Sequence, residues 1–247
     1  MQKRYLTGRT ALVTGAGRGL GRAISRRLAG LGARVVLGDV DTAALAETAR
    51  LIADQGGQAV PCAFDVADSR AVRAAFEQAG PVQVLVNNAG ICPLTPPDEI
   101  SETEWERVLA VNLKGAFLCT QAALPGLRAA GWGRVINIAS LAGQMGGIAV
   151  GVHYAASKAG LLGLTKSFAR HLAPYHVTVN AIAPGTAETD LTAAWPEEVR
   201  QDLKARIPLG RFIRPEEVAE AVAFLCSPAA DVITGATIDM NAGLLMR

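Results

Sequence analysis

Short apolar runs alternate with amphipathic stretches along the whole chain. Several of the runs are apolar throughout, which is typical of parallel strands covered on both faces. They predict strands at 10–14, 33–38, 59–64, 82–86, 134–139, 177–182 and 236–239. Apolar residues at helical spacing predict helices at 20–30, 42–55, 69–78, 102–123, 154–173 and 215–226. This alternation predicts an α/β fold, a doubly wound Rossmann-type sheet with helices on both faces.

The length fits one domain. Half of the 247 residues are hydrophobic, which is enough for a well-buried core, so we expect a single domain over 1–247. The least regular long stretch is 186–212, which combines Pro, Gly, Trp195 and mixed charges. We expect it to be a mobile loop that covers the substrate.

Charge and cysteine usage narrow the functional classes. The chain has 24 basic and 22 acidic residues and no basic block, so nucleic acid is not an indicated partner. Its four cysteines and three histidines are scattered, which predicts neither a disulfide framework nor a metal site. The N-terminus lacks a long apolar stretch. We therefore expect no signal peptide or membrane span, and a cytoplasmic location.

A glycine-rich turn follows the first predicted strand. It reads Gly15-Ala16-Gly17-Arg18-Gly19-Leu20-Gly21, and a helical pattern begins within it. Glycines in this position permit a tight turn and a close approach of the backbone to a pyrophosphate, which the free N–H groups of the helix start can bind. The turn, including Leu20, therefore predicts a dinucleotide site.

Asp39 ends the second predicted strand. A carboxylate there can accept hydrogen bonds from an adenosine ribose. It would also repel a 2′-phosphate, since two unit charges 4 Å apart interact by about 4 kcal/mol at an effective dielectric near 20. Asp41 adds to this effect, whereas Arg18 opposes it because its guanidinium could meet a phosphate. We predict NAD as the cofactor and leave NADP as the alternative.

Tyr154 and Lys158 are four residues apart and share one face of a predicted helix. A cation beside a phenol favours the phenolate and lowers the phenol pKa. Tyr154 could then move a proton on and off an alcohol oxygen. Ser140 ends an apolar run upstream and could bind the substrate oxygen. The pattern Tyr-x-x-x-Lys by itself is common on helices.

Taken together and in this order, these features resemble the short-chain dehydrogenase/reductase family in its compact form. Within it, the chain is most similar to 3-oxoacyl-carrier-protein reductases and to polyol and secondary-alcohol dehydrogenases. The resemblance covers nearly the whole chain and rests on Thr14 to Gly21, Asp65-Val66, Asn87-Asn88-Ala89-Gly90, Asn112, Ser140, Tyr154, Lys158, Pro184-Gly185 and Thr189.

The resemblance implies further properties. It implies a seven-stranded parallel sheet, a homotetramer or homodimer, and transfer of a hydride between a nicotinamide cofactor and a substrate carbon. Lys158 would also bind the nicotinamide ribose, and Asn112 would anchor a water that links Lys158 to solvent. The resemblance also implies three further groups of cofactor residues. Asp65 and Val66 would hold the adenine, and Asn88, Ala89 and Gly90 would line the cofactor beside the central strand. Pro184-Gly185 would be followed by Ala187 and Thr189, which would bind the nicotinamide carboxamide.

Two departures from the family pattern lie outside the catalytic positions. The interval from Ser140 to Tyr154 is slightly longer than the commonest family spacing, so segment 141–153 is expected to bulge differently. The stretch from Asp65 to Asn87 looks short, which predicts a trimmed helix at 69–78.

The substrate is less defined by the sequence. Besides Ser140 and Tyr154, the candidate substrate residues are Gln144 and Trp195, and the neighbouring positions are mostly small or apolar. This favours a neutral ketone or secondary alcohol, although Arg206, Arg211 or Arg214 could reach an anionic group. Three other functions stay open: an NADPH-dependent 3-oxoacyl reductase, a non-catalytic dinucleotide-binding protein, and a sugar-nucleotide epimerase or dehydratase. The chains of such epimerases and dehydratases are usually longer than this one.

Overall fold

A computed structural model describes residues 4–147, 150–193 and 195–246. Its strands form one parallel sheet in the order β3-β2-β1-β4-β5-β6-β7. The strands are β1 (Thr10–Thr14), β2 (Arg34–Asp39), β3 (Gln58–Ala63), β4 (Val84–Asn87), β5 (Gly133–Ile138), β6 (Val177–Pro184) and β7 (Thr237–Met240). The predicted seven-stranded parallel sheet is confirmed. The winding reverses between β1 and β4, and the crevice at such a reversal is where ligands bind in open α/β sheets.

Both faces of the sheet are buried. On β1, Ala11 and Val13 belong to one hydrophobic core, whereas Leu12 between them belongs to the other. Val36 and Leu85, the partners of Leu12 on the neighbouring strands, join the same core as Leu12. Because successive side chains point to opposite faces, a strand buried on both sides is apolar at every position.

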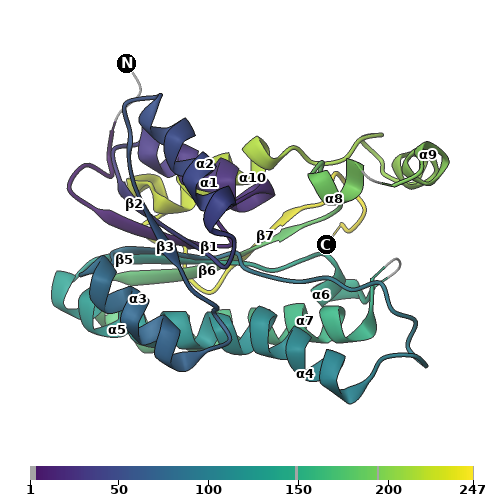
Figure 1. The fold of residues 1–247 in the computed structure, drawn as a ribbon, viewed down its shortest axis with the longest axis horizontal. Coiled ribbons are helices and arrows are strands. Elements are labelled where there is room, and N and C mark those ends of the chain that lie inside the picture. Colours follow the sequence, from purple (N-terminus) through teal and green to yellow (C-terminus); the bar gives the residue numbers. More distant parts are fainter. Residues whose placement is uncertain (1–3, 148–149, 194, 247) are drawn as a thin grey trace.

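Helices cover the sheet in two layers (Figure 1). One layer contains α1, α2 and α10, and the other contains α3, α4, α5 and α7. The α-helices are α1 (Gly19–Gly30), α2 (Thr42–Ala53), α3 (Ser69–Ala79), α4 (Glu102–Leu109), α5 (Gly115–Ala130), α6 (Ala142–Met145), α7 (Val152–Leu172), α8 (Asp190–Ala193), α9 (Glu197–Ala205) and α10 (Pro215–Cys226). Short 3-10 turns cover Ala173–Tyr175 and Pro228–Ala230.

The helix predicted at 102–123 is longer and is interrupted. A π-helical turn, Ala110–Lys114, separates α4 from α5. By length and composition alone, the run Glu102–Ala130 could cross a membrane. In the fold, Cys119, Ala123 and Leu127 of this run are buried in the core beneath the sheet. The apolar side of the run is therefore used for packing.

Two further predictions can be compared with the structure. Helix α3 covers the predicted 69–78 and ends at Ala79, and Asp68 caps its start by accepting from the N–H groups of Arg70 and Ala71. The predicted covering loop 186–212 contains helices α8 and α9, and in Figure 1 both lie beyond one end of the sheet. Residue 194 of that stretch and residues 148–149 of segment 141–153 lie outside the described residues.

Candidate active site

A cavity of about 350 Å³ opens at the carboxyl ends of the strands. Twelve of the residues singled out in the sequence line it: Leu20, Asn88, Gly90, Ser140, Tyr154, Lys158, Pro184, Gly185, Ala187, Thr189, Trp195 and Arg206. Its lining thus combines the loop after β4, the end of β5, α7 and the segment after β6. The other singled-out residues surround the cavity or lie farther away.

The predicted catalytic side chains meet in this cavity. The Tyr154 hydroxyl is hydrogen-bonded to Ser140, whose Oγ also accepts from the Ala142 N–H at 3.1 Å. Lys158 Nζ lies 5.7 Å from the centre of the Tyr154 ring. The same amine donates to the Ile138 carbonyl oxygen at 2.8 Å. A hydroxyl, a phenol and an ammonium therefore converge where an alcohol or carbonyl oxygen could be bound.

Burial dominates the titration of this group. It raises the pKa of Tyr154 to about 12, with a smaller upward contribution from Cys92 and a lowering one from the Ser140 hydrogen bond. Burial also lowers the pKa of Lys158 to about 8. Among the protein's own groups, the amine therefore does not offset the burial of the phenol. The prediction that Lys158 and the positive nicotinamide ring together lower the pKa of Tyr154 concerns the cofactor-bound enzyme and stays a prediction.

Asn112 lies on the π-helical turn and joins two parts of the site. Its Oδ1 accepts from the Ile91 N–H at 2.8 Å, and its Nδ2 donates to the Ile91 carbonyl oxygen at 2.9 Å. The same Nδ2 donates to Ser157 Oγ at 3.1 Å, and Ser157 donates to the Tyr154 carbonyl oxygen. Asn112 therefore links the loop after β4 to the first turns of α7. Ile91 and Ser157 have no sequence signal of their own.

The glycine turn is closely packed against its surroundings. A Cβ on Gly21 would lie 1.9 Å from the Gly15 carbonyl oxygen, and a Cβ on Gly17 would lie 2.8 Å from Ala44 Cβ. Gly15 and Gly19 have positive φ, which favours glycine. These contacts leave no room for side chains in the turn, which we call the glycine cradle, and a bare backbone there fits the approach of a pyrophosphate to the start of α1.

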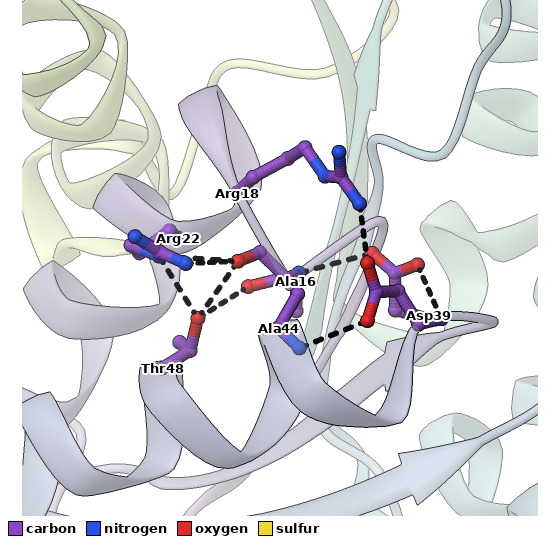
Figure 2. Close-up of polar contacts among 8 residues, drawn as sticks. Ala16, Arg18, Arg22, Asp39, Ala44 and Thr48 are labelled. Carbon is purple, nitrogen blue, oxygen red and sulfur yellow. Dashed lines mark hydrogen bonds and ion pairs between the residues drawn. The ribbon is translucent and has the colours of Figure 1, made fainter. Parts of the chain in front are cut away.

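Side chains that the sequence reading missed hold the turn in place. Arg22 donates to the Gly17 carbonyl oxygen at 2.6 Å, and Thr48 donates to the carbonyl oxygens of Ala16 and Gly17 (Figure 2). Thr48 is fully buried on α2. The turn is thereby attached to both of the helices that follow it.

Asp39 lies beside the same turn. Its Oδ2 accepts from the Gly17 N–H at 3.0 Å, and its Oδ1 accepts from the Asp41 N–H at 3.1 Å. Arg18 is paired with Asp41, whose carboxylate also caps α2 through the Ala44 N–H (Figure 2). The cap, more than Arg18, lowers the pKa of Asp41. Arg18, which the sequence reading directed to a phosphate, is thus held by a carboxylate.

Asp65 and Val66 follow β3 near the adenine side predicted from the family resemblance. Asp65 accepts from the Ala67 N–H at 2.8 Å and pairs with Arg107 at 3.1 Å. Val66 is buried, and Gly115 leaves the space for it, since a Cβ there would lie 2.8 Å from the valine side chain. The two residues thus have firmly fixed backbones.

Asn88 and Ala89 connect β4 to the glycine turn. The N–H groups of both residues donate to Thr14 Oγ1 at 3.0 Å. Asn88 Nδ2 donates to the carbonyl oxygens of Thr14 and Gly15. Asn88 therefore braces the reversal point of the sheet, where a dinucleotide would lie.

The segment after β6 is organised by Thr192, which the sequence reading also missed. Its hydroxyl donates to the Ala187 carbonyl oxygen at 2.8 Å and accepts from the Thr189 N–H at 2.9 Å. Ala187 and Thr189 are thereby fixed at the edge of the cavity.

Gln144 is placed differently from its prediction as a substrate residue. Its Nε2 donates to Asp239 Oδ1 at 2.6 Å, and the residue is not among those that line the cavity. The partner lies on β7, far away in the sequence, so local pattern could not reveal it. Of the predicted substrate residues, Ser140, Tyr154 and Trp195 line the cavity, and the role of Gln144 stays a prediction.

Known proteins are similar to this chain over nearly its full length. The family model for enoyl-(acyl carrier protein) reductase matches residues 15–245. The chain is 43% identical over 248 residues to the 3-oxoacyl-[acyl-carrier-protein] reductase FabG of Aquifex aeolicus, covering 97% of this chain and 98% of the relative. It is 44% identical over 240 residues to cis-4-hydroxycyclohexanecarboxylate dehydrogenase of Sinomonas cyclohexanicum, covering 95% and 96%.

A solved structure confirms the fold. The 3-oxoacyl-[acyl-carrier protein] reductase of Brucella melitensis with bound NAD matches with a TM-score of 0.93 at 37% identity, covering 99% of this chain and 94% of that one. The chain belongs to the short-chain dehydrogenase/reductase family. It is an oxidoreductase of that family, whose members use a nicotinamide cofactor and act on CH–OH groups.

Proposed function

We propose that this protein interconverts a secondary alcohol and its ketone with NAD as the preferred cofactor. The observation that carries the proposal is the convergence of Ser140, Tyr154 and Lys158 in one cavity, next to a glycine cradle. An absorbance screen at the reduced-nicotinamide band, with both cofactors and a panel of alcohols and ketones, tests it. No turnover with any of them would refute it and would favour a non-catalytic dinucleotide-binding protein.

The protein's own residues perform the proton transfer. Ser140 hydrogen-bonds the substrate oxygen and orients it toward Tyr154. In oxidation, Tyr154 takes the hydroxyl proton, and in reduction it returns a proton to the ketone oxygen. Because its pKa is about 12, Tyr154 is protonated at neutral pH, which is the form that reduction needs. When bound, the nicotinamide supplies the hydride acceptor or donor.

The surroundings of the glycine turn support NAD. Asp39 and Asp41 place two carboxylates there, and Arg18 is engaged with Asp41. A 2′-phosphate would meet net negative charge at this position. The Brucella melitensis relative was crystallised with NAD. The glycine cradle and Asp39 would hold the dinucleotide, with Lys158 at its nicotinamide end.

A second candidate function is a 3-oxoacyl reductase that uses NADPH. The identity to the Aquifex aeolicus reductase, over almost the full length of both chains, favours it. The two functions separate in one assay, which compares NADH with NADPH on a 3-oxoacyl thioester and on small ketones. Faster turnover of the thioester with NADPH would favour the second candidate.

We also propose that the protein acts in the cytoplasm as a homotetramer or homodimer. Phe117 on α5 is 39% exposed and lies 6.3 Å from the ring of Phe168 on α7, so an apolar surface is available for association. Light scattering coupled to size-exclusion chromatography tests this, and a monomer at micromolar concentration would refute it.

A further inference from the structure

Three arginines were candidates for reaching an anionic substrate group, and the structure separates them. Arg211 Nη2 and Arg214 Nη2 lie 2.8 and 3.1 Å from Glu217 Oε1, and neither residue is among those lining the cavity. The Glu217 carboxylate also accepts from the Arg214 N–H. Both guanidinium groups are thus committed to the start of α10. Arg206, at the end of α9, does line the cavity.

The charges around the cavity are few. Among the described lining residues, Lys158 and Arg206 are the cationic side chains, and none is acidic. Lys158 is buried and bonded to the Ile138 carbonyl oxygen at the catalytic end. Arg206 is flanked in the lining by Leu203 and Ile207. An anion that enters this cavity therefore meets two cations. Lys158 lies on α7, the helix of Tyr154, whereas Arg206 follows a different helix, α9.

Arg206 is available for a ligand. Its Nη2 lies 2.7 Å from Asp202 Oδ2, and the two side chains are 62% and 60% exposed. Exposed ion pairs of this kind contribute little and are screened by salt. A guanidinium has five N–H donors, so it can bind a second carboxylate with a free edge or exchange Asp202 for it.

Much of the cavity lining is apolar. Leu94, Met145 and Leu244 belong to it, together with Trp195, which lies just before α9 in the chain. An alkyl or alicyclic body can be buried against such side chains, whereas a polyol would lose hydrogen bonds to water without replacing them. The nicotinamide end of the cofactor would share this cavity of about 350 Å³, so the space left for the substrate suits a compact body.

We infer that the substrate is a compact hydroxy acid, in which an apolar body separates a secondary hydroxyl from a carboxylate that Arg206 binds. The inference rests on the proposed function, because Ser140 and Tyr154 are taken to receive the hydroxyl. Arg206 is then a residue that determines specificity, and the neutral alcohol predicted from the sequence becomes the poorer substrate.

A matched pair of alcohols tests the inference. We expect kcat/KM for 4-hydroxycyclohexanecarboxylate to exceed that for its carboxamide by ~10-fold or more, as hydrogen bonds to charged groups typically allow. Arg206→Gln should remove this preference, mainly through KM for the acid, while Arg206→Lys should keep part of it. Asp202→Asn should lower KM for the acid, because it removes the competing carboxylate.

Arg214→Gln is the matched control. Arg214 is as exposed as Arg206, at 63%, and is likewise paired with a nearby acid, but it lies off the cavity. Arg211 keeps Glu217 paired in that variant. The preference for the acid should be unchanged. Circular dichroism spectra that match wild type would show that each variant is folded.

Calorimetry with cyclohexanecarboxylate and cyclohexanecarboxamide gives a readout that needs no turnover. Binding of the acid that depends on Arg206 supports the inference. If the acid binds in this way but no alcohol is oxidised with either cofactor, the lack of turnover refutes the proposed function and leaves the anion site standing. Equal turnover of acid and carboxamide would overturn the inference. So would an equal loss of kcat/KM for both in Arg206→Gln, or a preference for a long-chain acyl thioester that is independent of Arg206.

Discussion

The Nε2 atom of His153 lies 2.8 Å from Glu104 Oε1, which joins a fully buried imidazole on α7 to a carboxylate on α4. His153 directly precedes Tyr154, and the start of α7 has no side-chain cap. This contact gives His153 a structural role. Glu104 therefore holds the first turn of α7, which carries Tyr154, the proposed proton-transfer residue.

We expect Glu104→Ala to lower kcat by about tenfold while leaving NAD affinity unchanged, because a small misplacement of Tyr154 slows the chemical step. Glu104→Gln should restore most of the rate, since an amide oxygen still accepts a hydrogen bond from the imidazole. Steady-state kinetics and fluorescence titration of NAD would measure both effects. A variant that lost NAD affinity instead would argue for general unfolding.

The same contact predicts acid sensitivity. A hydrogen bond with Thr95, and then one with His153, holds the pKa of Glu104 below its usual 4.5. A lowered carboxyl pKa contributes stability above the unfolded value, and this is lost as pH falls through the folded value. Wild type should therefore lose more stability below pH 4.5 than Glu104→Gln does, as measured by urea unfolding across that range.

Tyr154→Phe should lower kcat by about 10² or more, because general acid–base catalysis typically contributes 10²–10⁴-fold. The phenyl ring keeps its packing while the transferable proton is lost, so dinucleotide binding should be largely retained. Pre-steady-state and steady-state rates in both directions check this. Full turnover in the variant would exclude Tyr154 as the acid and base.

Lys158→Met should be inactive yet more stable than wild type near pH 6.5. Burial lowers the pKa of Lys158 from 10.5 to about 8. Such a shift corresponds to a cost of roughly 3 kcal/mol in folding free energy for burying the charged amine, which the variant avoids. The variant also loses the hydrogen bond to the Ile138 carbonyl oxygen, which offsets ~1 kcal/mol of this gain. Between pH 8 and 10.5 the unfolded chain binds more protons, so wild-type stability rises with pH and the difference shrinks. Urea midpoints at pH 6.5 and 10 would show a constant difference if the amine titrated normally.

Asp39→Ala should shift the cofactor preference toward NADP by about tenfold or more, since a close like charge is removed from the 2′-phosphate position. The change also removes the acceptor of the Gly17 N–H, so some loss with NAD is expected as well. The ratio of kcat/KM for the two cofactors is the measurement. An unchanged ratio would mean that Asp39 does not face the adenosine ribose.

Gly21→Ala should abolish dinucleotide binding or folding, because its Cβ would collide with the Gly15 carbonyl oxygen. Gly30→Ala is the control, since a Cβ at the last residue of α1 meets no atom within 4 Å. The control should be neutral or stabilising by up to ~1 kcal/mol. Thermal unfolding with and without NAD separates the two effects.

The fold was predictable because its central strands are buried on both sides. Continuous apolar runs such as Thr10–Thr14 carry that information locally, and the glycine turn marks the first crossover. The π-helical turn around Asn112 was not predictable, since apolar spacing does not distinguish one extra residue in a helical turn. Helix α9 had a signal that the reading missed, namely Pro196 followed by Glu197 and Glu198 in the first turn.

The sequence predicted which residues form the candidate site better than it predicted their pKa values. Ser140, Tyr154 and Lys158 meet as expected, but the pKa values of the phenol and the amine follow from burial, which is a tertiary property. The partner of Gln144 lies on β7 and that of His153 on α4. Contacts of such long sequence separation leave no periodic trace in the chain.

Helix α9 contributes no buried residue to the core. Its Leu203 lines the cavity, and so does Arg206, the residue that follows the helix. Substitutions in α9 therefore cost the fold little. The proposed proton-transfer residues, Ser140 and Tyr154, lie just after β5 and on α7, next to residues that are buried in the core. Substitutions in this peripheral helix can therefore change substrate specificity during evolution without altering the residues that transfer the proton.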